Sequence, residues 1–499
     1  MTEEGISLGR APAQAEPAQV EEWGSVERFE PGVSNRTVTA LASVAALGGF
    51  LFGYDSSVIN GAVAAIGTHF NIGAGTLGFA VASALLGAAA GAMVAGRVAD
   101  RLGRLWAMRV AAVLFFVSAI GTGLAPSLTL LIIFRVIGGV GVGAASVIAP
   151  AYIAEIAPAR IRGRLGSLQQ LAIVLGIFAA LLMDYIIGSS LASSPTSSLD
   201  GMQAWRWMFL AMVVPAVIYG IGAVFIPESP RYLVAKDRLT EAAEVMRRVL
   251  GNVDIPGKVR DIQETIAREV KPSLRDLRGP ALGLLPIVWV GIALSVFQQF
   301  VGINVIFYYS SVLWHAVGFS TSDSLLISVI TSVVNIVSTL IAISTIDRFG
   351  RKPLLLIGSV GMTVSLGVMA LIFGTAPIKH GEPSLGGAAG PIALVAANLF
   401  VVFFAMSWGP VVWVLLGEKF PNRIRAAALS VAAAAQWVAN WAISTSFPSL
   451  KNAGLGLAYG IYAFFALLSI LFVLRFITET KGVELEEMPE DIRGAATTR

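Results

Sequence analysis

Two ionisable side chains, Asp55 and Arg135, fall inside long apolar stretches of this sequence. A charged side chain in an apolar span is costly, and for that reason it indicates a functional site. Burial makes a carboxyl harder to ionise, whereas a neighbouring cation favours the charged form. A carboxyl whose cationic neighbour moves could therefore take up a proton on one side of a membrane and release it on the other. Two alternatives stay open for these residues: they form a fixed structural ion pair, or each merely lies at a helix interface.

Amide and aromatic side chains also occur within the apolar stretches. An amide both donates and accepts hydrogen bonds, as a sugar hydroxyl requires, and a Trp ring can cover the C–H face of a pyranose. Taken singly, each amide could instead hydrogen-bond between packed membrane helices. The candidate ligands are Gln170, Gln298, Gln299, Asn304, Asn335, Trp413, Gln436 and Asn440. Further candidates are Tyr308 and Tyr309, as gate residues or ligands, and Trp437, as a ligand or a packing residue.

Helix geometry decides which amides can face one cavity. Gln436 and Asn440 are four residues apart and share a helix face. Gln299 and Asn304 are five residues apart and do not share a face on an unbroken helix. We expect Gly302, which lies between them, to unwind the helix and turn Asn304 toward a central cavity, as discontinuous transporter helices do.

No catalytic constellation accompanies these residues. The chain has no cysteine and only three histidines, at positions 69, 315 and 380, so neither a thiolate site nor an imidazole cluster for a metal is expected. The glycine-rich run Gly138–Gly143 lies inside an apolar stretch, where close helix packing explains it better than phosphate binding. We therefore expect no cofactor, no metal and no enzymatic activity.

The elements that position the candidates are predicted to be membrane helices. The chain is 56% hydrophobic and 13% charged, which excludes an ordinary soluble domain. About twelve apolar stretches are long enough to cross a bilayer, for which roughly 20 helical residues suffice. They are continuous rather than alternating, so a β-barrel is not expected. Their ranges are 37–60, 74–99, 105–125, 129–154, 162–188, 205–226, 283–314, 320–346, 353–374, 389–416, 423–447 and 454–477.

These stretches predict an all-α membrane protein with twelve transmembrane helices in two six-helix halves. Between the halves, Leu239–Leu250 has apolar positions at helical spacing, which predicts short intracellular helices, with a solvated linker as the alternative. The predicted domains are a disordered cytoplasmic tail (1–36), a first half (37–226), an intracellular helical linker (227–282), a second half (283–478) and a second cytoplasmic tail (479–499).

Positive charge is concentrated in one alternate set of connections between the stretches. The opposite set has almost none, and residues 189–204 contain no Lys or Arg. By the positive-inside rule, the basic connections and both termini face the cytoplasm. Nucleic-acid binding is not expected, because the basic residues are scattered among membrane spans. They are Arg97, Arg101, Arg104, Arg109, Arg160, Arg162, Arg164, Arg348, Arg351, Lys352, Arg423 and Arg425.

Charged boxes occur twice, once in each half and in the same order. Internal repeats of this kind are typical of secondary transporters, which rock one half against the other. The sequence therefore favours transport as the function. The pairs are Asp100–Arg104 with Asp347–Arg351, Glu155–Arg162 with Glu418–Arg425 and, more weakly, Pro227–Arg231 with Thr478–Gly482.

These boxes resemble those of the sugar-porter branch of the major facilitator superfamily, and the resemblance runs from about Leu41 to Lys481. It is strongest to bacterial glucose–proton and xylose–proton symporters. This likeness implies proton-coupled import of a monosaccharide across the plasma membrane of a bacterial cell, with glucose as the expected sugar. The other matching motifs are Gly53-Tyr54-Asp55, Arg135-Val136-Ile137-Gly138-Gly139, Pro227-Glu228-Ser229-Pro230-Arg231 and Gln298-Gln299-Phe300-Val301-Gly302-Ile303-Asn304.

The resemblance also implies roles for the candidate residues. Asp55 matches the proton carrier and Arg135 the residue that tunes it, while most of the amides and Trp413 match sugar-binding positions. An uncoupled facilitator would be expected to lack the acid at position 55. A transporter-like sugar sensor would need a signalling domain, for which the tail after Glu479 is too short.

Charges near the helix ends are predicted to form a cytoplasmic latch. Pairs made by Glu155 and Glu418 would hold the cytoplasmic ends together in an outward-open state and separate when the cavity opens inward. Topology and lipid headgroup contacts are the alternative role of the arginines. The predicted latch arginines are Arg104, Arg162, Arg351 and Arg425.

We expect Asp184, in the fifth stretch, to face water without a role. The expected partners are a monosaccharide, a proton and the lipid bilayer, for a protein that functions as a monomer.

Overall fold

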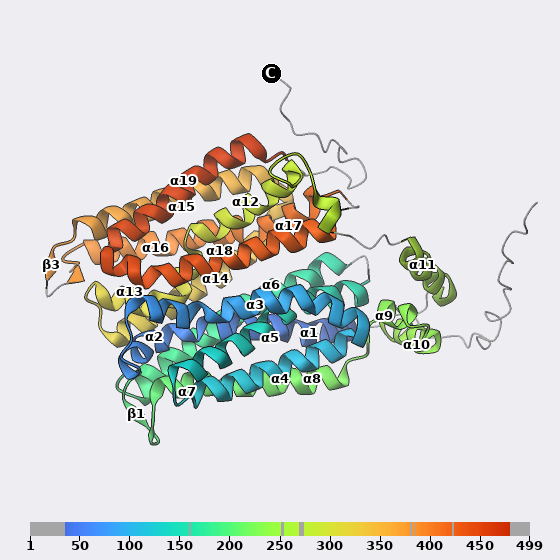
Figure 1. Ribbon diagram of the computed structural model, residues 1–499, viewed down its shortest axis with the longest axis horizontal. Helices are drawn as coiled ribbons and strands as arrows, with labels where there is room; N and C mark the ends of the chain where they lie inside the picture. Colours follow the sequence, from blue (N-terminus) through green and yellow to red (C-terminus); the bar gives the residue numbers. More distant parts are fainter. Residues whose placement is uncertain are drawn as a thin grey trace, which may run out of the picture.

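The two halves of the chain form two helical bundles that lie side by side, coloured blue to green and yellow to red in Figure 1. The computed structural model describes residues 35–158, 161–250, 254–268, 274–379, 382–383, 385–421 and 424–479. Eleven helices in this part of the chain are long and apolar enough to cross a membrane. The 29-residue helix α18 completes twelve spans. The structure thus confirms the predicted fold class.

The first bundle contains six spans, and two of them are interrupted. The first span consists of α1 and α2, which meet at Val58, and the sixth consists of α7 and α8. The helices are α1 (Asn35–Ser57), α2 (Ile59–His69), α3 (Ala74–Leu102), α4 (Arg104–Gly123), α5 (Leu128–Ile156), α6 (Arg162–Tyr185), followed by the π-helical turn η2 (Ile186–Leu191), α7 (Ala204–Leu210) and α8 (Val213–Phe225).

The second bundle also contains six spans, and its breaks lie in the first and fourth spans. Its first span consists of α12 and α13 and its fourth of α16 and α17. The helices are α12 (Pro286–Phe300), α13 (Ile303–Ala316), α14 (Thr321–Phe349), α15 (Arg351–Thr375), α16 (Ala389–Met406), α17 (Trp408–Lys419), α18 (Arg425–Ala453) and α19 (Leu455–Phe476).

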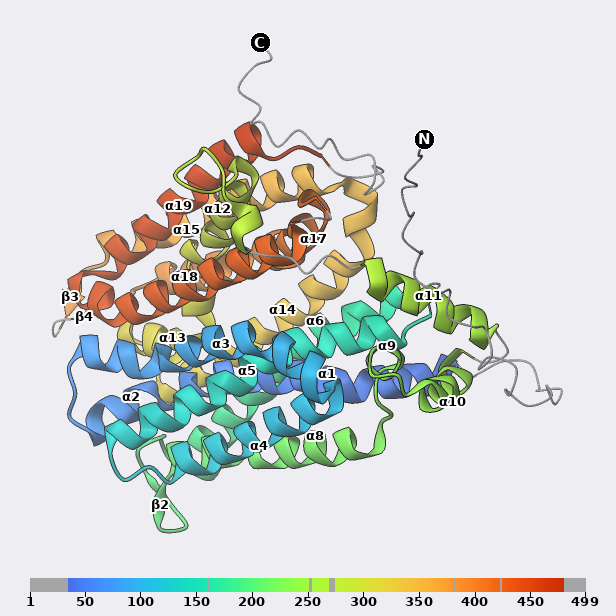
Figure 2. The ribbon, with the colours of Figure 1, turned by 45° about the vertical axis from the view of Figure 1, so that its right-hand side comes forward.

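The bundles have two distinguishable ends, which we call the linker end and the hairpin end. The linker end carries the short helices between the bundles, which pack apolar residues such as Leu233, Ala242 and Met246 into a small core of their own. The hairpin end carries two short β-hairpins (Figures 1 and 2). The linker helices are α9 (Pro230–Ala235), α10 (Leu239–Leu250), α11 (Ile255–Arg268) and the 3₁₀ turn η3 (Leu274–Leu277), and the hairpins are β1 (Ser198–Leu199) with β2 (Met202–Gln203) and β3 (Ile378–Lys379) with β4 (Glu382–Pro383).

Small residues bring helices of the first bundle into close contact. Gly139 on α5 faces the backbone carbonyl of Ala84 on α3, and Gly143 faces that of Ala88 one turn further along, so closely that neither position has room for a side chain. The glycine-rich run in α5 is therefore a helix-packing surface, as the sequence indicated. Membrane helices commonly associate through such small residues.

The sequence repeat has a structural counterpart at the linker end. The carboxylate of Glu228 accepts hydrogen bonds from the backbone N–H groups of Arg104 and Leu105 at 3.1 and 3.2 Å, at the start of α4. In the second half, Glu479 accepts the N–H groups of Arg351 and Lys352 at 3.0 and 3.1 Å, at the start of α15. Each carboxylate supplies partners for first-turn amides that have none within the helix.

Candidate functional site

Four membrane spans of the described chain are interrupted partway along their length, and three of the breaks, at Val58, Gly302 and Ser407, organise the candidate site. Gly302 separates α12 from α13 with a left-handed backbone (φ 81°), as predicted from its place between Gln299 and Asn304. A Cβ atom at this glycine would lie 2.7 Å from the ring of Tyr462, so both the backbone and the packing require glycine. The other two breaks, at Val58 and Ser407, have no such glycine.

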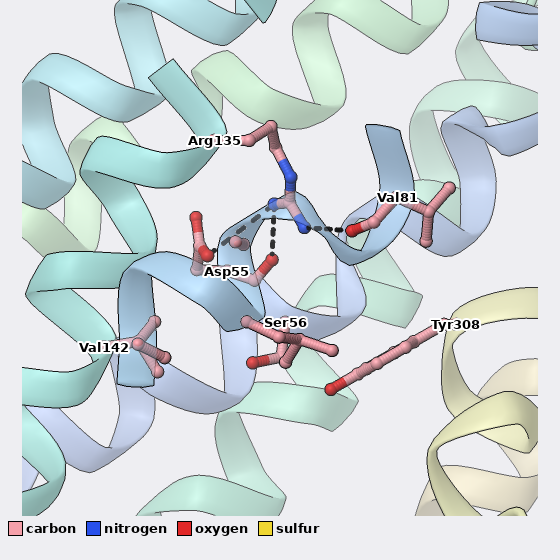
Figure 3. Close-up of a pocket in the computed structure, with 9 residues that line it drawn as sticks. Asp55, Ser56, Val81, Arg135, Val142 and Tyr308 are labelled. Carbon is pink, nitrogen blue, oxygen red and sulfur yellow. Dashed lines mark hydrogen bonds and ion pairs between the residues drawn. The ribbon is translucent and has the colours of Figure 1, made fainter. Parts of the chain in front are cut away.

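Asp55 and Arg135 face each other inside the first bundle (Figure 3). Both side chains are almost wholly buried, with 2% of each exposed, and the Arg135 Nη1 atom lies 3.6 Å from the Asp55 Oδ2 atom. The guanidinium donates its hydrogen bonds elsewhere, to the backbone carbonyls of Asp55 at 3.0 Å and Val81 at 3.4 Å. Among the described residues, Asp55 Oδ2 has no hydrogen-bond partner. The pair is therefore an ion pair by charge and distance but not a hydrogen-bonded one.

Residues of both bundles line a small cavity beside this pair. The cavity measures about 10 Å³, close to the space that one water molecule needs, and its lining includes Asp55, Ser56, Arg135 and Tyr308. Tyr308 belongs to α13 of the second bundle and lies beside Ser56 of the first bundle at this cavity (Figure 3). Its hydroxyl also interacts with the side chain of Asn440 on α18. The tyrosine thus lies between the cavity beside Asp55 and one candidate amide of the second bundle, Asn440.

Three of the candidate amides form a hydrogen-bonded chain across the helix breaks. Asn304 Nδ2 donates to Gln299 Oε1 at 2.6 Å, and Gln299 Nε2 donates to Gln298 Oε1 at 3.2 Å. Gln298 Nε2 in turn donates to the backbone carbonyl of Trp408, at 2.9 Å, directly after the break in the fourth span of the second bundle. The structure therefore places these predicted ligands together.

The candidates on α18 lie at the boundary between the bundles. The Oε1 atom of Gln436 is buried without a hydrogen-bond partner among the described residues. Asn440 is 5% exposed and accepts a hydrogen bond from Ser444 Oγ at 3.1 Å. The Trp437 ring packs against Phe52 of the first bundle, with ring centroids 5.8 Å apart. An unsatisfied buried acceptor costs about 1–3 kcal/mol, which a ligand hydroxyl could offset.

The remaining predicted ligands have no hydrogen bond to this cluster among the described residues. Gln170 on α6 is half-buried, Asn335 on α14 is 7% exposed, and Trp413 on α17 is 45% exposed. Sequence reasoning passed over Gln169, next to Gln170, whose side-chain amide is buried without a described partner. Its place in the sequence gave no signal that distinguished it from its neighbour.

The predicted latch residues pair within each half. Arg104 binds Glu155 with both Nε and Nη2, at 3.1 and 2.9 Å, and Arg351 Nη2 lies 2.9 Å from Glu418. Arg425, the first residue of α18, donates a hydrogen bond to the backbone carbonyl of Phe420. The Arg162 side chain lies outside the described residues. The pairing of Glu155 and Glu418 with arginines across the halves, in another state, stays a prediction.

Three hydrogen bonds described between the bundles lie at the hairpin end. Ser311 of α13 donates from its backbone N–H to Asn60 Oδ1 at 2.9 Å and from its hydroxyl to the Asn60 carbonyl at 2.5 Å. Ser189 and Ser322 add a hydroxyl pair 2.5 Å apart. Gly78 on α3 also approaches the backbone of Thr445 on α18. The bundles are therefore held together at this end.

The expectation for Asp184 was wrong. The residue is 0% exposed and accepts the backbone N–H of Gly61 at 2.9 Å. Its place late in the fifth span suggested exposure at an outer end, but α2 of the first span covers it. The phase of one helix does not reveal which other helix lies over it.

The chain matches the family model described as "Sugar (and other) transporter" over residues 41–492. It is 57% identical to a glucose transport protein of Synechocystis over 453 residues, or 90% of this chain and 97% of the relative. It is 39% identical to the D-xylose-proton symporter of Escherichia coli, covering 90% and 95% of the two chains. The partially occluded inward-open structure of the Escherichia coli xylose transporter superposes with a TM-score of 0.78 at 37% identity, covering 90% of this chain and all of that one. The buried charge pair, the broken helices and the clustered amides thus belong to a member of the sugar transporter family, a multi-pass membrane transporter and not an enzyme.

Proposed function

We propose that the protein is a proton-coupled monosaccharide importer that works by alternating access, with glucose as its sugar. The observation that carries the coupling is the loose contact between Asp55 and Arg135. Because Arg135 donates its hydrogen bonds to backbone carbonyls, the guanidinium would keep these bonds when the Asp55 carboxyl is protonated. A buried carboxyl that can gain and lose a proton without rebuilding its surroundings suits a carrier.

The sugar site and the proton site are close enough to influence each other. Asn304 and Tyr308 are four residues apart on α13 and share a helix face. Asn304 belongs to the amide chain, and Tyr308 lines the cavity beside Asp55. A sugar that displaced the contacts of Asn304 would therefore act on the same helix that completes the wall of the proton site. This is the physical link that symport requires.

We assign the linker end to the cytoplasm, because the basic connections gather there and positive loops are retained inside. The hydrogen bonds between Asn60 and Ser311 would then close the outer side, and we infer that the structure is inward-facing. Two inward-open forms of the Escherichia coli xylose transporter superpose with TM-scores of 0.78 and 0.76, which supports this assignment.

Glucose is proposed as the sugar because the 57% identical relative is a glucose transport protein, whereas the 39% identical one is a xylose–proton symporter. The test is uptake of labelled sugars into proteoliposomes, with and without an imposed pH gradient, in competition with hexoses and pentoses. Accumulation of glucose that requires the gradient is the expected result. Equilibration of the sugar without accumulation would favour the uncoupled facilitator. Preference for a pentose would contradict the proposal of glucose as the substrate and leave the proposed proton coupling unchanged.

A further inference from the structure

Asp184 is a buried carboxyl that the proposed transport cycle does not use. It is completely buried on α6, and its Oδ2 atom accepts the backbone N–H of Gly61 at 2.9 Å. Its Oδ1 atom has no hydrogen-bond partner among the described residues. A polar group is rarely buried in this way without a reason.

The bond to Gly61 caps a helix from outside that helix. Gly61 is the third residue of α2, and first-turn N–H groups have no acceptor within their own helix. The residue before α2, Val58, has no side chain that can cap it, so Asp184 provides the acceptor instead. A Cβ atom at position 61 would lie 2.7 Å from the Asp184 Cγ atom. Only glycine lets the carboxyl reach the backbone here.

The residue next to this cap makes the contact between the bundles. Asn60 precedes Gly61 and receives two hydrogen bonds from Ser311 of α13, one through its side chain and one through its backbone carbonyl. The peptide group that links Asn60 to Gly61 therefore binds Ser311 through its carbonyl and Asp184 through its N–H. Its orientation is set from both sides at once.

We propose that Asp184 is a positioning residue for the outer gate, acting through Gly61 to hold Asn60 where Ser311 can bind it. The inference rests on the alternating access of the proposed function and adds to it a residue that sets the closure of the hairpin end. Asp184 acts as a hydrogen-bond acceptor, so an amide oxygen at this position would serve as well.

The test measures how often the hairpin end opens. The natural chain has no cysteine, so Leu77→Cys gives a single reporter. Leu77 lines a cavity of about 180 Å³ between the two bundles at this end. The rate at which a membrane-impermeant maleimide labels it in cells reports the opening. The variants are Asp184→Leu, which removes the acceptor, Asp184→Asn, which keeps one, and Asn60→Ala, which removes the side-chain contact with Ser311.

Loss of one hydrogen bond should raise the labelling rate about fivefold in Asp184→Leu and in Asn60→Ala. Asp184→Asn should label at the parent rate. The double variant Asp184→Leu/Asn60→Ala should raise the labelling rate by less than the product of the two single effects, because both changes act on the same two-bond contact between Asn60 and Ser311. Parent-like labelling of Asp184→Leu, equal effects of Leu and Asn at this position, or additive effects in the double variant would each overturn the proposal.

Gly61→Ala provides an independent test if Asp184→Leu does not reach the membrane. Its added methyl group displaces the carboxyl while leaving Asp184 in place, so faster labelling supports the proposal and parent-like labelling contradicts it. The assay uses neither a proton gradient nor glucose. An error in the proposed coupling or substrate would therefore appear in the uptake experiments and not here.

Discussion

The Arg135 guanidinium lies 3.6 Å from the Asp55 carboxylate, yet it donates its hydrogen bonds to the backbone carbonyls of Asp55 and Val81. The arginine is thus held by the protein backbone and influences the carboxyl mainly through its charge. This arrangement separates two properties that mutations can test one at a time: the position of the cation and the presence of the ionisable acid.

Arg135→Gln should impair gradient-driven uptake far more than counterflow exchange. Without the cation the buried carboxyl loses the charge that favours its ionised form, so it should release its proton poorly on the inner side. Counterflow does not require that release. The measurement is uptake driven by a pH gradient beside counterflow, in the same proteoliposomes. Equal losses in the two assays would show that Arg135 supports the fold or the sugar site instead.

Gln299→Ala and Gln436→Ala should each weaken sugar binding. A hydrogen bond lost to a buried partner costs about 1–3 kcal/mol, or roughly 5- to 150-fold in affinity. Both amides are better test sites than Gln298, which also holds the backbone of α17 through Trp408. Binding is measured by calorimetry in detergent. Asn398→Ala is the control, because the Asn398 amide donates to its own helix at Leu394. Unchanged affinity in both test variants would remove them from the site.

Glu228→Ala should destabilise the protein more than Glu228→Gln. The carboxylate uses one oxygen for the Arg104 N–H and the other for the Leu105 N–H, and a glutamine keeps only one acceptor oxygen. Loss of a helix cap typically costs about 0.5–2 kcal/mol. The midpoint of thermal unfolding in detergent should therefore fall in the order Glu, Gln, Ala.

The control for this series is Glu241→Ala, which removes an exposed acid that pairs only with Arg238 among the contacts described. Exposed pairs contribute little, so its midpoint should stay near that of the parent. Equal midpoints for the Gln and Ala variants at position 228 would contradict the capping role.

The fold and part of the site could be predicted because their signals are local. Long apolar runs specify membrane helices, and Gly302 marks a break because only glycine readily takes the backbone angles it adopts. The sequence repeat also aligns Glu228 with Glu479, and each of them caps a helix in the structure. Each apolar run, glycine break or charged box is recognised from residues that are neighbours in the sequence.

The contacts between the bundles at the hairpin end could not be predicted, because they join residues far apart in the chain. The break at Val58 has neither glycine nor proline to mark it, and the bond from Gly61 to Asp184 spans 123 positions. The contact between Asn60 and Ser311 spans 251 positions. Such pairs follow from how whole helices pack, which hydrophobic pattern alone does not determine.

Arg351→Ala and Glu418→Gln should shift the resting population toward the inward-open state. In the inward-facing arrangement proposed above, Arg351 binds Glu418 of its own half at 2.9 Å. We predict that these charges bind across the halves when the linker ends meet, so their loss weakens the outward-open state. Cysteines introduced near the linker end should be labelled faster from the inside, with little change in sugar affinity. Arg238→Ala, in the exposed linker pair, is the matched control. Labelling of the Arg351→Ala and Glu418→Gln variants at the parent rate would contradict the latch, and these charges would then serve only to set the membrane topology.

Asp55→Asn tests the central claim most directly, because the amide mimics the protonated acid and cannot release a proton. One charge moving through 100 mV contributes about 2.3 kcal/mol, enough to concentrate a neutral sugar roughly fiftyfold. The measurement compares sugar accumulation under an imposed proton gradient with counterflow, in proteoliposomes that hold the parent or the Asp55→Asn protein. We predict that the variant loses accumulation and keeps sugar binding and counterflow. Vesicles of Asp55→Asn that still accumulate sugar against its gradient would show that the proton travels by another route, and would contradict the assignment of Asp55 as the carrier.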